Sequence, residues 1–280
     1  MKKIEKILVA VAGRGLCEEV VNQLLVSPSI QDAKLTLLHV VPAQISSDAV
    51  AEKLAEGGKI LADAVSTINM DASKINPRLK QGDPKTIVCD VAQEENADLI
   101  IMGSRGLGRL VSILENSVSQ YVFQLADRPM LLVKDDVYVK RFKRIMVALD
   151  ASDSAAEALE SALYLAKDLP DCQLILAHVN PPDPELAASA DPVLSAAAKR
   201  AALLGVSTTC ITETGKAGPE ICKLAEDQNV DLLVLGSPDR RPSVAKGLPD
   251  IDRLLGKSLS DYVRVYANCP VLLVRNNGEA

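Results

Sequence analysis

The 280-residue sequence is poor in aromatic side chains, in histidine and in positive charge. Aromatic residues make up 2% of the chain and tryptophan is absent, which excludes aromatic platforms that stack single-stranded bases. The formal net charge is −6 at pH 7, and the lysines and arginines form no basic stripe, so we expect no nucleic-acid partner. No apolar run reaches membrane-spanning length, so we also expect no membrane partner.

Clusters of metal-binding residues are missing as well. The six cysteines lie far apart without a C-x-x-C pair, and only His39 and His178 could join them, so we expect no metal site. Such cysteines are typical of reduced, buried thiols in a cytoplasmic protein. Each histidine ends an apolar run, and the sequence places no serine, cysteine or carboxylate to work with it. We therefore expect structural histidines and no catalytic residue.

The chain is 48% hydrophobic, and with so few aromatics its core must be valine, isoleucine, leucine and alanine, the usual filling of parallel sheets. It also repeats itself. Segments of the first half recur in the second: Ile7–Ala10 as Ile145–Ala148, Leu37–Val40 as Leu176–Val179, Ala97–Ser104 as Val230–Ser237, and Arg128–Val133 as Cys269–Val274. The repetition predicts two similar domains, residues 1–138 and 139–280, and makes Ile7–Ala10 a strand rather than part of a signal peptide.

Short apolar runs alternate with longer amphipathic stretches in each half. In the first half this pattern predicts strands near residues 4–12, 34–41, 73–81, 98–103 and 129–134, and helices at 16–26, 48–69, 84–95 and 117–126. Asp83 followed by Pro84 indicates a helix start. The alternation predicts an α/β fold of two repeated, doubly wound parallel-sheet domains, with ligands at the carboxyl ends of the strands where the winding reverses.

A glycine-rich segment, Gly103–Ser117, joins a predicted strand to a predicted helix. Glycines let the backbone approach a ligand and a helix N-terminus attracts anions, so this segment suits a phosphate. Glycines also end strands without any ligand, and that alternative stays open. If the first and fourth strands are neighbours, Gly13–Gly15 faces this segment, and Asp150–Ser154 faces Gly236–Ser258 in the second half.

These residues resemble the universal stress protein family in its tandem-domain form, over nearly the whole chain. Nucleotide-binding members carry a first strand ending in Asp, a His-Val at the end of the second strand, and Gly-x-x-Gly, nine residues, then Gly-Ser or Gly-Thr. The resemblance implies a Rossmann-like fold that binds ATP or a related adenine nucleotide, with Mg as a candidate counter-ion. The phosphates would lie on the glycine loop, the ribose near the Asp and the base beside the strand-two valine.

In the first half the resemblance assigns nucleotide binding to Val40, Gly103, Gly106, Asn116 and Ser117. Ala12 stands where the family has Asp, which removes a charged acceptor for the ribose worth about 1.5 to 3 kcal/mol. Asn116 stands where the family has its last glycine, at a cost of about 1 to 2 kcal/mol if a left-handed backbone is needed. Weakened binding follows, although Arg14 could compensate by meeting a phosphate.

In the second half the same role falls to Asp150, Val179, Gly236, Gly247, Lys257 and Ser258. Its two loop glycines lie eleven positions apart, where those of the first half lie three apart, and Lys257 replaces the last glycine. Arg240, Arg241 and Lys246 make the inserted segment basic, which could attract phosphates or merely solvate it. Asp150 could equally cap a helix starting near Ser152. Because the first loop is compact, we expect tighter binding in the first half.

Three functions are compatible with this reading. The first is a nucleotide-binding stress or signalling protein, the second a scaffold of the same fold without a nucleotide, and the third a weak ATP hydrolase. Neither half places a base, a metal-binding acid and a nucleophile together, so activity beyond a weak ATPase is not expected. The last strand of each half should lie at a sheet edge, and the resemblance implies that these edges pair within the chain as a pseudo-dimer. A further homodimer stays open.

Overall fold

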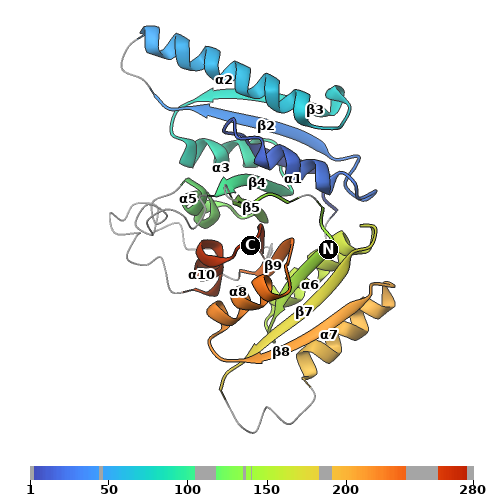
Figure 1. The fold of residues 1–280 in the computed structure, drawn as a ribbon. Coiled ribbons are helices and arrows are strands. Elements are labelled where there is room, and N and C mark those ends of the chain that lie inside the picture. Colours follow the sequence, from blue (N-terminus) through green and yellow to red (C-terminus); the bar gives the residue numbers. More distant parts are fainter. Residues whose placement is uncertain are drawn as a thin grey trace. The chain divides into compact units, whose positions relative to one another are not determined.

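The computed structural model describes residues 3–43, 47–104, 118–134, 137–139, 141–182, 191–237 and 258–275. It divides into two compact units, residues 2–140 and residues 141–280 (Figure 1). Each unit is an α/β domain built on a parallel sheet, as the sequence predicts. The predicted boundary between residues 138 and 139 and the packing of one unit on the other stay predictions.

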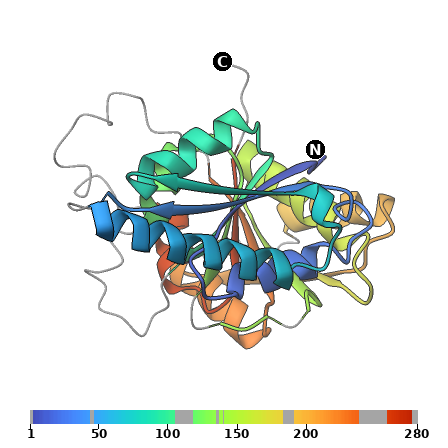
Figure 2. The same cartoon turned by 90° about the horizontal axis from the view of Figure 1, so that it is seen from above.

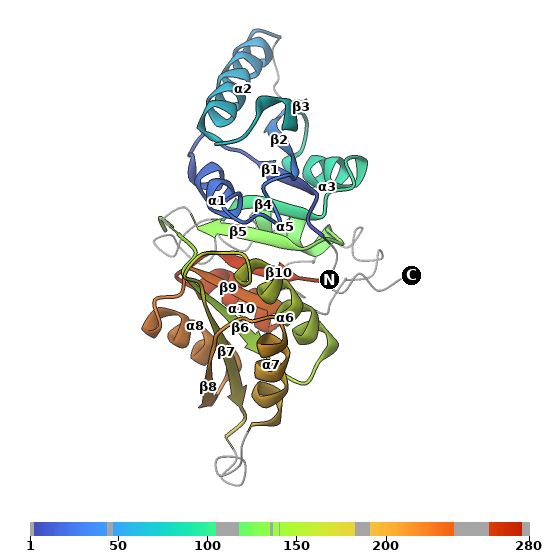
Figure 3. The same cartoon turned by 90° about the vertical axis from the view of Figure 1, so that its right-hand side faces the viewer.

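The first unit holds five described strands: β1 (Lys6–Ala10), β2 (Lys34–Val41), β3 (Ile75–Gln81), β4 (Leu99–Ser104) and β5 (Met130–Lys134). Their order is β3-β2-β1-β4-β5. The described helices are α1 (Leu16–Leu24), α2 (Ser47–Thr67), α3 (Pro84–Glu94) and α5 (Val118–Leu125), with a short 3₁₀ turn η1 (Ala72–Lys74). In Figures 2 and 3, α2 covers one face of the outer strands and α3 covers the other.

The second unit repeats this plan. Its described strands are β6 (Arg144–Leu149), β7 (Gln173–Asn180), β8 (Thr208–Thr214), β9 (Leu232–Gly236) and β10 (Val271–Val274), in the order β8-β7-β6-β9-β10. The described helices are α6 (Asp153–Ala166), α7 (Pro192–Leu203), α8 (Ala217–Asp227) and α10 (Leu259–Tyr266). Figure 3 shows α6 and α7 on one side of this sheet and α8 on the other. Both units are therefore doubly wound.

The predicted elements of the first half agree with the structure to within a few residues. Asp83 caps α3 as expected, because its side chain accepts a hydrogen bond from the backbone N–H of Lys85. The strand predicted from residue 73 begins instead at Ile75. The Asp71 side chain accepts from the N–H of Ser73 and so holds the preceding residues in the 3₁₀ turn.

The inner strands of each sheet are largely buried on both faces, and most of their buried residues are valine, isoleucine, leucine, alanine and methionine. The outer strands β3 and β8 are largely exposed. Exposure of β8 corrects the expectation of uniformly buried thiols: Cys210 on this strand is exposed and Cys89, Cys172 and Cys222 are half-buried, although all six cysteines are free. No helix among the described residues combines the length and apolar character that a membrane crossing requires.

Candidate functional site

The strand order creates a crevice at the carboxyl ends of the strands in each unit. β1 lies between β2 and β4, and β6 lies between β7 and β9, so the first and fourth strands of each repeat are neighbours, which is the condition that the sequence analysis set for a shared crevice. The described helices after the first strands, α1 and α6, lie on the opposite face of their sheets from those after the fourth strands, α5 and α10, since α5 packs with α3 and α10 packs with α8. This reversal of winding leaves room for a ligand beyond the strand ends.

In the second unit this crevice holds a cavity of about 280 Å³. It lies beyond β6 and β9 and is bordered by the first turns of α6 and α10. Its lining includes polar residues, one glycine and the valine of the strand-two motif: Asp150, Ser152, Ser154, Val179, Gly236, Ser258 and Ser260. The structure thus brings together four of the residues that the sequence proposes for nucleotide binding in this half: Asp150, Val179, Gly236 and Ser258.

Two helix N-termini open into this cavity. Ser152 caps α6 by accepting a hydrogen bond from the N–H of Ala155 at 3.2 Å, and Ser258 caps α10 by accepting from the N–H of Asp261 at 3.2 Å. The N-terminus of a helix carries unpaired N–H groups and a partial positive charge. Two of them directed at one cavity favour an anionic ligand such as a phosphate.

Asp150 lies at the exposed rim of the cavity, directly after β6. Its Oδ1 accepts hydrogen bonds from the backbone N–H of Ser152, at 2.9 Å, and from the Ser152 hydroxyl. The N-cap of α6 is Ser152 and not Asp150, so the predicted capping role of Asp150 is wrong, and Asp150 instead holds the capping serine. The described residues give its second oxygen, Oδ2, no hydrogen bond, so this oxygen can accept one from a ligand.

Gly236 ends β9 where α6 passes closely over the strand. A Cβ at this position would overlap the carbonyl group of Ser154 and lie 2.8 Å from the backbone nitrogen of Ala155. The glycine is therefore required by the packing of the helix, whether or not a ligand is bound. The same approach brings the first turn of α6 to the floor of the cavity.

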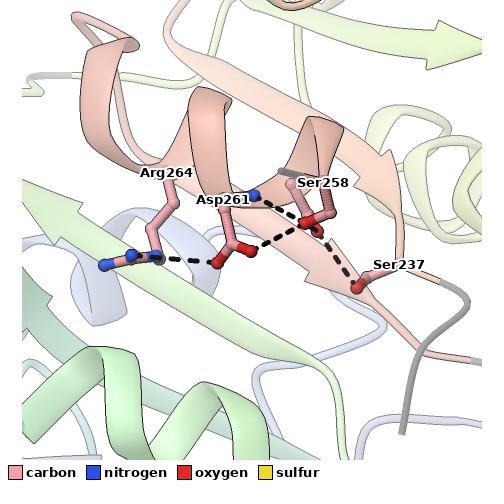
Figure 4. Close-up of polar contacts among 5 residues, drawn as sticks. Ser237, Ser258, Asp261 and Arg264 are labelled. Carbon is pink, nitrogen blue, oxygen red and sulfur yellow. Dashed lines mark hydrogen bonds and ion pairs between the residues drawn. The ribbon is translucent and has the colours of Figure 1, made fainter. Parts of the chain in front are cut away.

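Behind the cap of α10 lies a polar cluster that the sequence analysis missed (Figure 4). The Ser258 hydroxyl donates to Asp261 Oδ2 at 2.9 Å and lies 3.1 Å from the hydroxyl of Ser260, which the Ser237 hydroxyl contacts at 3.4 Å. Arg264 Nη2 lies 3.9 Å from Asp261 Oδ1, and both side chains are buried. Burial lowers the pKa of Arg264, against the opposing effect of the Asp261 charge. The cluster fixes the hydroxyls that face the cavity.

The equivalent cavity of the first unit is smaller, about 180 Å³. It is lined by Ala12, Arg14 and Gly103, as the sequence analysis expects, but Val40 is not among its lining residues. Its unexpected member is Glu18 in the first turn of α1, which is 3% exposed. Burial raises the pKa of Glu18. An acid in this position opposes the binding of a phosphate.

Five of the proposed binding residues lie outside the described residues: Gly106, Asn116, Ser117, Gly247 and Lys257. Their roles stay predictions. Within the described part of the chain, no three histidine, cysteine, aspartate or glutamate side chains are grouped so that they could hold a metal ion.

Both histidines make structural hydrogen bonds, but one of them has a partner that the sequence did not reveal. His39 Nδ1 donates to the carbonyl oxygen of Val11 at 2.9 Å. His178 Nδ1 donates to Asp191 Oδ2 at 2.7 Å, so the expectation that no carboxylate accompanies the histidines is wrong. Asp191 also caps α7 through Oδ1. Its Asp-Pro sequence, like that at residue 83, was the available signal for the cap.

Comparisons with known proteins agree with this architecture. A sequence model of the universal stress protein family matches the chain twice, over residues 3–134 and 141–275. The chain therefore belongs to the universal stress protein family, in a tandem form.

Similar proteins include the universal stress protein YxiE of Bacillus subtilis (strain 168), which is 28% identical over 156 residues, spanning 48% of this chain and 99% of YxiE. A solved universal stress protein from Archaeoglobus fulgidus is 21% identical, with a TM-score of 0.71 and 96% of each chain covered, and it shares the fold. A universal stress protein solved in complex with cAMP is 27% identical over 47% of this chain and 95% of its own, with a TM-score of 0.36.

Proposed function

We propose that this protein binds ATP or a related adenine nucleotide in stress response or signalling, and that its principal site is the cavity of the second unit. The observation that carries the proposal is the convergence of two capped helix N-termini, those of α6 and α10, on one cavity at the carboxyl ends of β6 and β9. Phosphates are the anions best suited to such a position.

The lining residues supply a place for each part of the nucleotide. The N–H groups and serine hydroxyls at the two helix starts face the phosphates, and Ser258 and Ser260 are held there by the cluster behind them. Asp150 Oδ2 would accept a hydrogen bond from a ribose hydroxyl. Val179, at the end of β7, would lie beside the base, as the family resemblance implies.

A magnesium ion would enter this site with the nucleotide rather than before it. Mg²⁺ is usually held by one or two carboxylates together with substrate phosphates and water. Asp150 is the one carboxylate among the described residues that line the cavity, and one of its oxygens is engaged by Ser152. The phosphates of the nucleotide would therefore provide most of the ligands that the ion needs.

This proposal reverses the expected order of the two halves. The first unit lacks the rim carboxylate, since Ala12 replaces it, and places Glu18 in its smaller cavity. The N-cap of α1 is Gly15, which offers no side chain to close the first turn. These features favour a first unit that binds no nucleotide at the carboxyl ends of its strands. The first unit would then have the scaffold function that the sequence analysis considers. We propose no hydrolytic role, because Asp150 is the one carboxylate among the described residues that line the cavity, and the proposal places it at the ribose.

Photolabelling with 8-azido-ATP tests the location of the site. The full chain is irradiated with the probe, digested and mapped by mass spectrometry, with and without excess unlabelled ATP. We expect ATP-protected label in peptides from residues 141–280. Protected label confined to residues 2–140 would contradict the choice of unit, and label that ATP does not reduce would contradict nucleotide binding altogether.

A further inference from the structure

A second polar cavity lies at the opposite end of the first unit's strands and plays no part in nucleotide binding. We propose that this cavity, whose lining includes Lys6, Lys34 and Thr36, binds a small phosphorylated metabolite that carries free hydroxyl groups. The cavity measures about 310 Å³, within the usual range for small-molecule sites. Thr36 is four residues from Val40 on β2, so the two ends of the strand are separated by roughly 13 Å.

The cavity forms where the amino ends of three parallel strands meet the end of α3. Lys6 pairs with Lys34, and Leu8 pairs with Thr36, across β1 and β2. Thr36 pairs in turn with Asn76 on the outer strand β3. The 3₁₀ turn η1 contributes Ser73 and Lys74, and Glu95 and Ala97 follow α3. The lining therefore mixes ammonium groups, hydroxyls and an amide over an apolar base.

The ammonium groups of Lys6 and Lys34 at this cavity are available to a ligand. Among the described residues, no ion pair engages Lys6 or Lys34, whereas Lys74 pairs with Asp32 at 2.7 Å.

The acids nearby are occupied. Glu95 pairs with Arg78 at 2.6 Å, and the Asp98 carboxylate accepts the backbone N–H groups of Glu5 and Lys6 at 3.0 Å. Two lysines can thus bind a phosphate as point charges without breaking an existing pair.

Thr36 adds a hydroxyl to this lining. The residue is 7% exposed, and no hydrogen bond of its hydroxyl is found within the described part of the chain, but the oxygen atom itself is still reached by solvent. A ligand hydroxyl or phosphate oxygen in the cavity would take the place of that water.

The second unit carries different residues at the same two positions. Ile175 stands at the position of Thr36, paired with Met146 as Thr36 is paired with Leu8. Gln173 stands at the position of Lys34, and its side chain donates to Thr209 Oγ1 at 2.8 Å. At these positions the second unit thus has an apolar side chain and a glutamine with a local hydrogen bond, where the first unit has a threonine and a lysine that line a cavity.

The chemistry of the lining defines the ligand class. Lysine offers donors only, which suits the phosphate, while hydroxyl and amide groups can exchange hydrogen bonds with ligand hydroxyls. Thr36, Ser73 and Asn76 supply these groups around the cavity. A sugar phosphate combines both features in a molecule of suitable size.

The second unit also supplies the substitutions for a test. Thr36→Ile and Lys34→Gln each introduce the residue that the other repeat already accepts in the same fold, so the variants should remain folded. Backbone amide NMR of the ¹⁵N-labelled full chain is recorded during titration with glucose 6-phosphate. Glucose alone and inorganic phosphate alone are titrated in parallel, and Lys80→Gln, at the other end of β3, is the matched charge control.

We expect shifts centred on Lys34, Thr36 and Asn76, with binding at least tenfold weaker in the double variant Thr36→Ile/Lys34→Gln and unchanged in Lys80→Gln. No shifts up to 10 mM ligand, or equal binding by the double variant, would overturn the site. Equal affinity for inorganic phosphate would overturn the assignment to a hydroxylated phosphate ester. The shifts caused by glucose 6-phosphate should persist in the presence of saturating ATP. This outcome does not depend on whether the nucleotide proposal is correct.

Discussion

Single residues decide which carboxyl-end cavity can accept an anion. In the first turn of α1 Glu18 lines the cavity of the first unit, whereas in the first turn of α6 Ala155 lines the cavity of the second unit. The helix start therefore contributes a buried acid in one unit and a methyl group in the other. This exchange, with the replacement of Asp150 by Ala12, accounts for the proposed difference in nucleotide affinity.

Glu18 should make the stability of the first unit depend on pH. Burial raises the pKa of Glu18, so the folded chain holds this proton more tightly than the unfolded chain does. The resulting stabilisation is complete below the unfolded pKa of about 4.3 and is lost as the pH rises through the raised value. Glu18→Gln should therefore raise the melting temperature at pH 7 to 8, with the gain shrinking toward pH 4. Glu19→Gln serves as the control, and a gain independent of pH would refute the assignment.

At the scale of elements, the contact of α6 with β9 sets the floor of the proposed nucleotide site. Gly236→Ala would force the Ser154 carbonyl to move, which should cost about 1 to 3 kcal/mol of unfolding free energy. In the first unit a Cβ on the corresponding Gly103 meets no described atom within 4 Å. Urea unfolding of both alanine variants tests this difference. An equal loss in the two variants would show that close helix packing is not the cause.

Helix capping offers a second comparison between equivalent elements. Asp83 and Asp191 both precede a proline and both cap a helix, but Asp191 also accepts from His178. Removing either cap should cost about 1 kcal/mol, and Asp191→Ala should cost more because it also leaves His178 without its acceptor.

The extra cost of Asp191→Ala should depend on pH. Burial alone would raise the pKa of Asp191, but hydrogen bonds from His178 and from the N–H groups of Leu194 and Val193 outweigh it and hold the pKa below its ordinary range. The stabilisation is therefore present above the unfolded pKa of about 3.9 and is lost as the pH falls through the lowered value. Unfolding free energies at pH 7 and pH 3 measure this, and a pH-independent difference between the two variants would contradict it.

The sequence predicts the elements better than the contacts between them. Apolar periodicity and the internal repeat predicted the strands, the helices and the doubly wound class, because these depend on local pattern. The pairing of His178 with Asp191 and the burial of Glu18 depend on how the helices pack against the sheet, which the local sequence pattern does not specify. Asp261 and Arg264 are adjacent on one helical turn, yet nothing in their spacing distinguishes a buried pair from a solvated one.

At the scale of the whole molecule, two copies of one fold carry different polar cavities. On the proposals made above, the second unit binds an adenine nucleotide at the carboxyl ends of its strands, and the first binds a phosphorylated metabolite at the amino ends. One chain would then respond to two ligands. Each unit retains the fold of the family, and the two units differ at the residues that line their cavities.

We propose that the two units pair through their last strands. Within its own unit β5 pairs with β4, and β10 pairs with β9. Cysteines introduced by Leu132→Cys and Leu272→Cys should react with a short cross-linker within one chain, and the single variants provide the controls. Linked peptides found only between chains, or reaction only at surface cysteines, would show that these strands do not pair intramolecularly.

The central claim is that the second unit holds the nucleotide with Asp150 at its rim, and calorimetric titration with ATP tests it most directly. Asp150→Ala should weaken binding by about ten- to a hundredfold, since a hydrogen bond to a charged group contributes about 1.5 to 3 kcal/mol. Asp227→Ala, at the exposed end of α8, should leave the affinity unchanged. Equal affinity of the Asp150→Ala variant and the parent chain, with the parent binding ATP, would contradict the account.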